Sequence, residues 1–238
     1  PISGVPIGHY RSLIRALAIV KQAAAQANFE LGELSAEIND AISKACQEVA
    51  DGKFDSEFVV DAIQGGAGTS TNMNANEVIA NRAIEILGGT KGDYDIVHPL
   101  NDVNKSQSTN DVYPTALKLA LILEINELLK AMAHLKGAFQ GKADEFKDVI
   151  KMGRTQLQDA VPMTLGQEFA TFSRMTMEDI QRLQETVPLL REINLGGTAI
   201  GTGLNAPAGY AQKACLILSK LSGFDFMVAE DMVEATKD

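Results

Sequence analysis

A fifteen-residue stretch, Asn101–Thr115, gathers amides, hydroxyls and carboxylates immediately before a long apolar-periodic segment. Pro114 suits the first turn of a helix, where its missing N–H has no partner to lose, and Asp111 fits a helix cap just before it. Free backbone N–H groups and the helix dipole favour an anion at such a helix start. Taken alone, the pattern also fits an ordinary helix cap. Three polar residues are expected at this helix N-terminus: Ser108, Thr109 and Asn110.

A second stretch, Gly65–Glu77, is rich in glycine and hydroxyl groups and leads into a predicted helix over residues 78–87. Thr69 lies near its beginning. Glycine permits a close approach of the backbone to a ligand, so this segment is a further candidate for binding a small anion. It is neither a Walker A loop, because no Gly-Lys-Ser/Thr follows, nor a dinucleotide-binding GxGxxG fingerprint. A glycine turn that merely starts a helix is the alternative.

A third polar turn, Gly153–Pro162, carries Thr155 and Gln156. It precedes a segment in which Thr164 and Gln167 have the spacing of a capping box, which predicts the start of another helix. The three polar turns therefore share one design, in which neutral donors collect at the end of a long helix.

The three turns are rich in uncharged donors and poor in basic residues, with only Lys105 and Arg154 close by. Such a set suits a small dicarboxylate held by oriented O–H and N–H groups. Removing a proton next to a bound carboxylate produces a dianionic aci-carboxylate. Donors fixed in advance around that charge stabilise it, and losing one of them commonly costs ~3 kcal/mol in the barrier.

The elements that must position these turns are predicted to be mainly helical. From Leu117 onward the apolar residues recur in steps of three and four, which predicts a helix over residues 115–150, roughly 50 Å long. A rod of this kind cannot bury its apolar stripe alone and needs partner helices. Short mixed elements give way to long helices near residue 108. We therefore predict an N-terminal domain over residues 1–107 and the first part of a helical-bundle domain over residues 108–238.

Composition narrows the function. The chain has 238 residues with 21 basic and 31 acidic side chains, and its net charge of −10 argues against nucleic acid or an anionic membrane as partner. No apolar run is long enough to cross a bilayer. Cys46 and Cys215 lack CxxC spacing, so a reduced, cytoplasmic protein is expected. No metal site is expected either, because no second His or Cys stands at ligand spacing from any histidine. The histidines are His9, His98 and His134.

These motifs resemble those of the aspartase/fumarase superfamily and, within it, most closely the aspartate ammonia-lyases. The resemblance implies a mainly α enzyme with a small N-terminal helical domain and a central long-helix bundle that assembles into a homotetramer. It implies active sites built from three subunits and chemistry that needs no metal or organic cofactor. The reaction would be the reversible anti-elimination of ammonia from L-aspartate to give fumarate, through an aci-carboxylate. Four segments carry the resemblance: Gly65–Glu77, Asn101–Thr115, Gly153–Glu168 and Leu195–Pro207.

The resemblance also implies roles for individual residues. Asn110 would approach the substrate amino group. Thr155 and Gln156, from another subunit, would help to hold the α-carboxylate or the amine. Three hydroxyls would bind the β-carboxylate and stabilise the aci-carboxylate: Thr69, Ser108 and Thr109.

Gln156 bears on the alternative that the protein is a class II fumarase, which hydrates fumarate to malate. Those enzymes typically have His in the Gly-Arg-Thr-His turn, whereas this chain has Gln, as many ammonia-lyases do. A third possibility, from another class, is a non-catalytic helical oligomerisation module whose polar turns are only caps.

One family feature is missing from residues 1–238. Members place their general base, a serine, on a loop reading Gly-Ser-Ser-x-Met-Pro-x-Lys-x-Asn-Pro, and no such segment occurs here. The chain is therefore expected to correspond to the front and middle of the enzyme, as a truncated piece without catalytic activity of its own.

Overall fold

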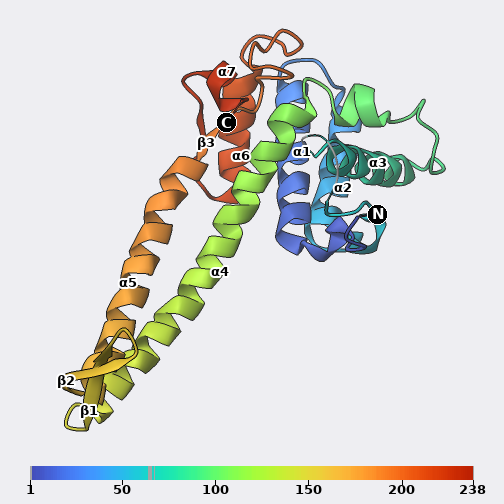
Figure 1. The fold of residues 1–238 in the computed structure, drawn as a ribbon. Coiled ribbons are helices and arrows are strands. Elements are labelled where there is room, and N and C mark those ends of the chain that lie inside the picture. The colour runs from blue at the N-terminus through green and yellow to red at the C-terminus, as the bar shows by residue number, and fades with distance from the viewer. Residues whose placement is uncertain (1, 64–65, 67, 238) are drawn as a thin grey trace. The chain divides into compact units, whose positions relative to one another are not determined.

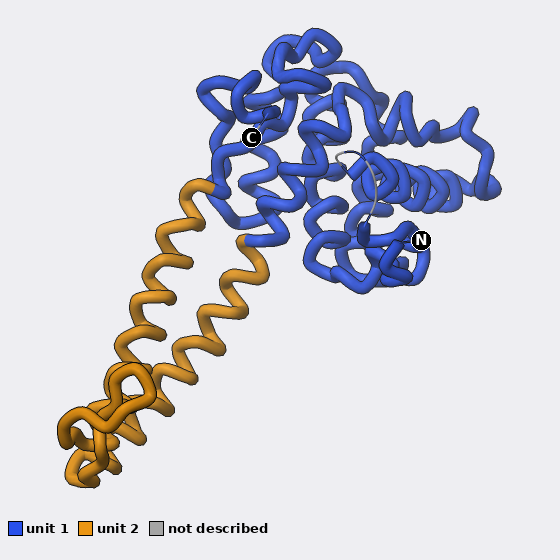
Figure 2. Tube along the Cα trace, in the orientation of Figure 1, with its two compact units in different colours: residues 1–121, 190–238 blue, residues 122–189 orange. Residues whose placement is uncertain are grey.

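The chain is mainly helical in the computed structural model, which describes residues 2–63, 66 and 68–237. It divides into two compact units, coloured separately in Figure 2. Unit 1 comprises residues 1–121 and 190–238, and unit 2 comprises residues 122–189. Unit 2 is thus inserted, in sequence, between the two parts of unit 1.

Unit 1 is organised around one alanine-rich helix, α1, which packs against α2, α3 and α6 (Figure 1). Small side chains let neighbouring helices approach closely, and several alanines of α1 are fully buried. Two short strands, β3 and β4, pair in parallel. The elements of unit 1 are η1 (Ile7–His9), α1 (Arg11–Glu30), α2 (Ala36–Ala50), η2 (Asp55–Glu57), α3 (Thr69–Ile86), the π-helical turn η3 (Pro99–Val103), the first part of α4 (Thr109–Glu145), β3 (Glu192–Ile193), α6 (Tyr210–Ser222), β4 (Met227–Val228) and α7 (Met232–Ala235).

Unit 2 consists of the remainder of α4, a β-hairpin and nearly all of α5 (Leu165–Leu190) (Figure 1). The hairpin strands, β1 (Ile150–Thr155) and β2 (Gln158–Thr164), are antiparallel. A cluster of phenylalanine rings with centroids 5.6–6.3 Å apart joins the two helices. Its members are Phe139, Phe146, Phe169 and Phe172. Gly166 fits where a Cβ atom would lie 2.6 Å from the Ala143 carbonyl oxygen, so the helices can meet closely.

The predicted long helix is confirmed with shifted ends. It runs over Thr109–Glu145, 37 residues or about 55 Å, and it tolerates Gly137 and Gly141 in its exposed part. The capping box is also confirmed. The Thr164 N–H donates to Gln167 Oε1 at 2.9 Å, and the Gln167 N–H donates to Thr164 Oγ1 at 3.1 Å.

Other local predictions need correction. The helix predicted over residues 78–87 begins earlier, at Thr69. Near the end of the described chain, Val228 pairs in β4 and the helix that follows is short, over Met232–Ala235. The domain boundary between residues 107 and 108 stays a prediction. Among the helices that the structure describes, none combines the length and hydropathy needed to cross a bilayer.

Candidate active site

The start of α4 is fixed by a reciprocal pair of hydrogen bonds. Ser108 Oγ accepts from the Asn110 N–H at 3.2 Å, and Asp111 Oδ1 accepts from the Ser108 N–H at 2.9 Å. Ser108 therefore caps the helix and Asp111 closes the motif from three residues further on. The prediction that Asp111 is itself the cap was one turn too late.

Asp111 ties this helix start to the glycine-rich loop that follows β3. Its side chain is fully buried, and Oδ2 accepts from the N–H groups of Gly196 and Thr198 at 3.1 and 2.9 Å. Burial raises the pKa of the carboxyl to about 6, opposed mainly by the three backbone N–H donors. Thr198 has a φ of 58°, so the loop adopts a left-handed turn to reach the carboxylate. The loop and the helix start thus form one fixed assembly.

The start of α4 has a second anchor, which is a hydrogen bond to a carbonyl that Pro114 leaves without its helical donor. Because proline has no N–H, the carbonyl of Asn110, four residues earlier, lacks its helical donor. The buried Asn194 supplies the replacement, with Nδ2 3.0 Å from that carbonyl oxygen. The Asn110 side chain is held as well, because its Nδ2 donates to the Ala199 carbonyl at 2.7 Å. Asn110 is therefore positioned through both its backbone and its amide.

A buried lysine holds the loop that leads to Ser108. Lys21 of α1 has no exposed surface, and its Nζ donates to Asn104 Oδ1 at 2.8 Å and to Gln107 Oε1 at 2.9 Å. Burial lowers the pKa of this amine to about 7, opposed by the charge of Asp111. Lys21 thus fixes the amide side chains of Asn104 and Gln107 in the loop.

A second polar residue of α1 secures the same loop. Asn28 is buried, and its Nδ2 donates to the Lys105 carbonyl at 3.0 Å, while its Oδ1 accepts from Ser106 Oγ at 2.7 Å. Ser106 has a φ of 62°, a left-handed conformation that needs such outside support in a residue with a side chain. Two buried polar residues of α1 therefore set the path into α4.

The starts of α3 and α4 lie together. Thr69 is the first residue of α3 and is exposed. The preceding Gly68 has a φ of 80° and lies against the ring of Tyr113, where a Cβ atom would be only 2.5 Å away. One turn into α3, Asn72 Nδ2 donates to Thr109 Oγ1 at 3.1 Å. The structure thus brings two of the three predicted turns to one place, although Gly65 and Ala67 fall outside the described residues.

Thr155 and Gln156 lie elsewhere, at the end of the hairpin in unit 2. This third polar turn is the tip of a β-hairpin, so the prediction that its donors collect at a helix end was wrong, whereas the helix start predicted at Thr164 is confirmed. The two tip residues, Gln156 and Leu157, have φ values of 47° and 67°. Two successive positive φ angles define the tight turn that matches the twist of antiparallel strands, although Asn and Gly are its usual residues. Leu157 is 100% exposed, and Thr155 and Gln156 are also exposed.

Several positioning residues were missed from the sequence. Two of them carry a detectable signal, because they are an amine and an amide at positions where helical spacing predicts burial. Lys21 and Asn28 follow Leu17 at steps of four and seven on the buried side of α1. The missed residues are Lys21, Asn28, Asn72, Asn104, Gln107 and Asn194.

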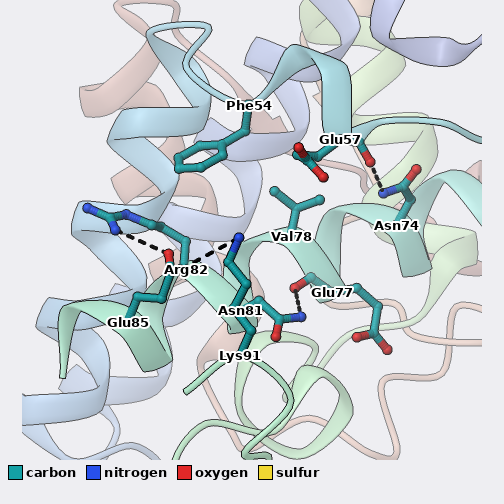
Figure 3. A pocket seen from close by; sticks show the side chains of 9 residues that line it. All are labelled: Phe54, Glu57, Asn74, Glu77, Val78, Asn81, Arg82, Glu85 and Lys91. Atoms are coloured by element: carbon teal, nitrogen blue, oxygen red, sulfur yellow. Dashed lines mark hydrogen bonds and ion pairs between the residues drawn. The ribbon is translucent and has the colours of Figure 1, made fainter. Parts of the chain in front are cut away.

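One cavity of the described chain has a charged lining and lies away from these residues. It measures about 240 Å³ beside α3, and Figure 3 shows its charged lining. Arg82 is paired with Glu48 and Glu85, and Lys91 with Glu85, so these cations are already neutralised. We therefore do not assign it to the substrate.

His98 has a local structural role. Its Nδ1 accepts from the backbone N–H groups of Leu100 and Asn101 at 3.0 and 3.2 Å, which caps η3. Within the residues that the structure describes, no group of three His, Cys, Asp or Glu side chains is arranged to hold a metal ion.

The fold and these motifs are those of the aspartase/fumarase superfamily, and comparison with known proteins agrees. The family model described as "Lyase" matches residues 7–238, and the chain belongs to this family.

Two curated relatives illustrate the similarity. The chain is 58% identical over all 238 residues to the aspartate ammonia-lyase of Pseudomonas canavaninivorans. It is 49% identical, again over all 238 residues, to that of Escherichia coli strain K12. In both comparisons the matched region covers 100% of this chain and 50% of the relative. The chain therefore spans about half the length of the curated relatives it matches.

Solved structures show the same likeness. The fumarate lyase:delta crystallin of Brucella melitensis bound to cobalt superposes with a TM-score of 0.95 at 55% identity, over 98% of this chain and 51% of that one. The recombinant class II fumarase of Schistosoma mansoni superposes with a TM-score of 0.88 at 38% identity, over 94% of this chain and 50% of that one.

Proposed function

We propose that the whole protein to which this chain belongs is an aspartate ammonia-lyase, which converts L-aspartate reversibly to fumarate and ammonia. The observation that carries the proposal is the joined start of α3 and α4, where Ser108 and Thr109 stand at a fixed helix N-terminus and Asn72, in the first turn of the helix that Thr69 begins, contacts Thr109. The curated relatives, at 49–58% identity, bear this activity in their names.

The chemistry of this helix start suits a carboxylate that gains charge. In an anti-elimination, a base removes a proton from the carbon next to the β-carboxylate, and the electron pair moves onto that carboxylate. The resulting aci-carboxylate then expels ammonia from the opposite face. Hydroxyl and backbone N–H donors that are already in place need no reorganisation as the charge grows. We assign the donors of this site to Thr69, Ser108 and Thr109.

Asn110 suits the other end of the substrate. One N–H of its Nδ2 donates to the Ala199 carbonyl at 2.7 Å, which orients the amide and leaves Oδ1 as an acceptor. A carbonyl oxygen accepts from an ammonium group but offers no donor to a carboxylate. This orientation supports a role for Asn110 in binding the substrate amine.

We further propose a homotetramer in which Thr155 and Gln156 complete the site of a neighbouring subunit. Within unit 2, Leu128 and Leu135 of α4 are 48% and 46% exposed, seven residues apart along one helix face. Met175 of α5 is 55% exposed, so apolar surface remains on both helices. A heptad-spaced stripe of this kind is stabilised by packing against further helices. The small dicarboxylate substrate, the cytoplasmic location and chemistry without a cofactor stay predictions.

The test is a substrate comparison on the whole protein. We expect fumarate to form from L-aspartate, seen by its ultraviolet absorbance, with ammonia released in equal amount and no product from L-malate. The 238-residue chain alone, which lacks the serine-loop motif, is the matched control and is expected to give no fumarate. Fumarate from malate with none from aspartate would assign the protein to the fumarases instead.

A further inference from the structure

Thr109 has one hydrogen-bond partner on its hydroxyl oxygen. Asn72 Nδ2 donates to Thr109 Oγ1 at 3.1 Å. A hydroxyl group that accepts a hydrogen bond still carries its own hydrogen to donate. Among residues 2–63, 66 and 68–237, no acceptor takes that hydrogen. The direction of the Asn72 amide therefore decides whether the Thr109 hydroxyl remains a donor for a ligand.

The direction of the Asn72 amide is set by Asn104. Asn72 Nδ2 also donates to Asn104 Oδ1, at 3.1 Å. Turning the Asn72 amide over would bring its Oδ1 against Asn104 Oδ1, and two acceptors repel each other. The Oδ1 atom of the buried Asn72 has no hydrogen-bond partner in the described chain. A hydrogen bond to this oxygen therefore does not explain the orientation of the amide.

The direction of the Asn104 amide is set in turn by Lys21. Lys21 Nζ lies 2.8 Å from Asn104 Oδ1 and carries N–H donors whether it is an ammonium or a neutral amine. On its other side Asn104 Nδ2 donates to the Gln107 carbonyl at 3.3 Å. An amine therefore fixes Asn104, Asn104 fixes Asn72, and Asn72 fixes the hydroxyl of Thr109.

We propose that Lys21, Asn104 and Asn72 form a directional relay that keeps the Thr109 hydroxyl poised to donate to the substrate carboxylate. Asn72 is then a positioning residue, because it acts through Thr109 without touching the substrate. The assignment rests on the proposed function for the role of Thr109, but the relay itself rests on the contacts of unit 1.

Asn76 provides a matched control one turn further along α3. It is as buried as Asn72 and donates to the same atom, Asn104 Oδ1, at 3.2 Å. Among the described contacts it has none with Thr109. Removing either amide deprives Asn104 of one donor and leaves a similar gap in the core, and only one of the two removals frees Thr109.

The experiment is a double-mutant cycle in the whole protein, with kcat and KM for aspartate as readouts. We expect Thr109→Val to lower kcat/KM by about 100-fold, because it removes a donor to the growing charge. Asn72→Ala should lower kcat by about 10-fold with little change in KM, since the hydroxyl remains but is no longer directed. Asn76→Ala should change kcat less than about 2-fold. In the Thr109→Val background, Asn72→Ala should have no further effect.

Two outcomes would overturn the relay. One is an Asn72→Ala loss that is equally large in the Thr109→Val background. The other is an equal loss of kcat for Asn76→Ala and Asn72→Ala at similar melting temperatures. Failure of the proposed function looks different, because the unaltered protein then gives no fumarate from aspartate. The same cycle is then measured with malate or, without turnover, with the affinity for succinate.

Discussion

The helix start at Ser108–Asp111 and the hairpin tip at Thr155–Gln156 are both polar turns, but they are built in opposite ways. At the helix start, Asp111 is fully buried and accepts three backbone N–H groups. At the tip, the side chains of Thr155 and Gln156 are exposed and make no hydrogen bond within the described chain. The nearest pair, Arg154 with Asp159, is itself about 70% exposed.

The difference separates polar groups that are hydrogen-bonded within the chain from polar groups that remain available to a ligand or another subunit. Polar groups that are buried must find partners inside the chain, because an unmade bond there costs free energy. Exposed groups at a turn with two positive φ angles carry backbone strain without an internal contact that compensates for it. Strain of this kind concentrates at binding and catalytic sites, which supports our proposal that the tip completes the site of a neighbouring subunit.

The largest expected effect comes from removing the buried carboxylate. Asp111→Ala leaves three backbone donors without their acceptor and should lower the free energy of unfolding by about 3–5 kcal/mol. Denaturant unfolding of the chain measures this. The matched control is Asp159→Ala at the hairpin, where an exposed pair with Arg154 should contribute less than about 0.5 kcal/mol. Equal losses at the two positions would erase the contrast between the two regions.

A smaller effect is expected from the anchor that Pro114 creates. Asn194→Ala should cost about 1–2 kcal/mol, because the Asn110 carbonyl loses the donor that replaces its helical partner. In a Pro114→Ala background the helix regains an N–H at this position, so the same substitution should cost less. Unfolding free energies of the four variants give the coupling. An Asn194→Ala cost that is independent of residue 114 would argue against this anchor.

The smallest effect is expected at the tip and has the opposite sign. Leu157→Gly should raise the free energy of unfolding by about 0.5–1 kcal/mol, because glycine adopts a φ of 67° without steric cost. Gly68→Ala at the other region should lower it, since φ is 80° there and the Tyr113 ring occupies the space of a Cβ atom. Thermal unfolding compares the two variants. A destabilised Leu157→Gly protein would show that Leu157 makes a stabilising contact.

The sequence was sufficient to predict the long helix and the capping box of Thr164 and Gln167, because periodicity and local polar spacing are short-range signals. It also placed Ser108 at a helix start, whereas the helix after the second polar turn was predicted to begin at residue 78 and begins at Thr69. The β-hairpin was missed because its tip is Gln-Leu, whereas tight hairpin turns are usually marked by Asn-Gly. The Lys21 network was missed because its contacts join residues 83–86 positions apart, and a single sequence does not reveal such pairs.

The bond between Asn194 and the Asn110 carbonyl spans 84 residues, and most of the intervening chain belongs to unit 2. It acts as a clasp at the base of an insertion. Bringing the ends of so long a loop together carries an entropic cost that grows only slowly with loop length. Unit 1 should therefore tolerate an insertion that is shortened or extended by matched heptads in α4 and α5. The bond between Asn194 and Asn110 depends only on the positions of the two ends of this segment, which such a change leaves in place.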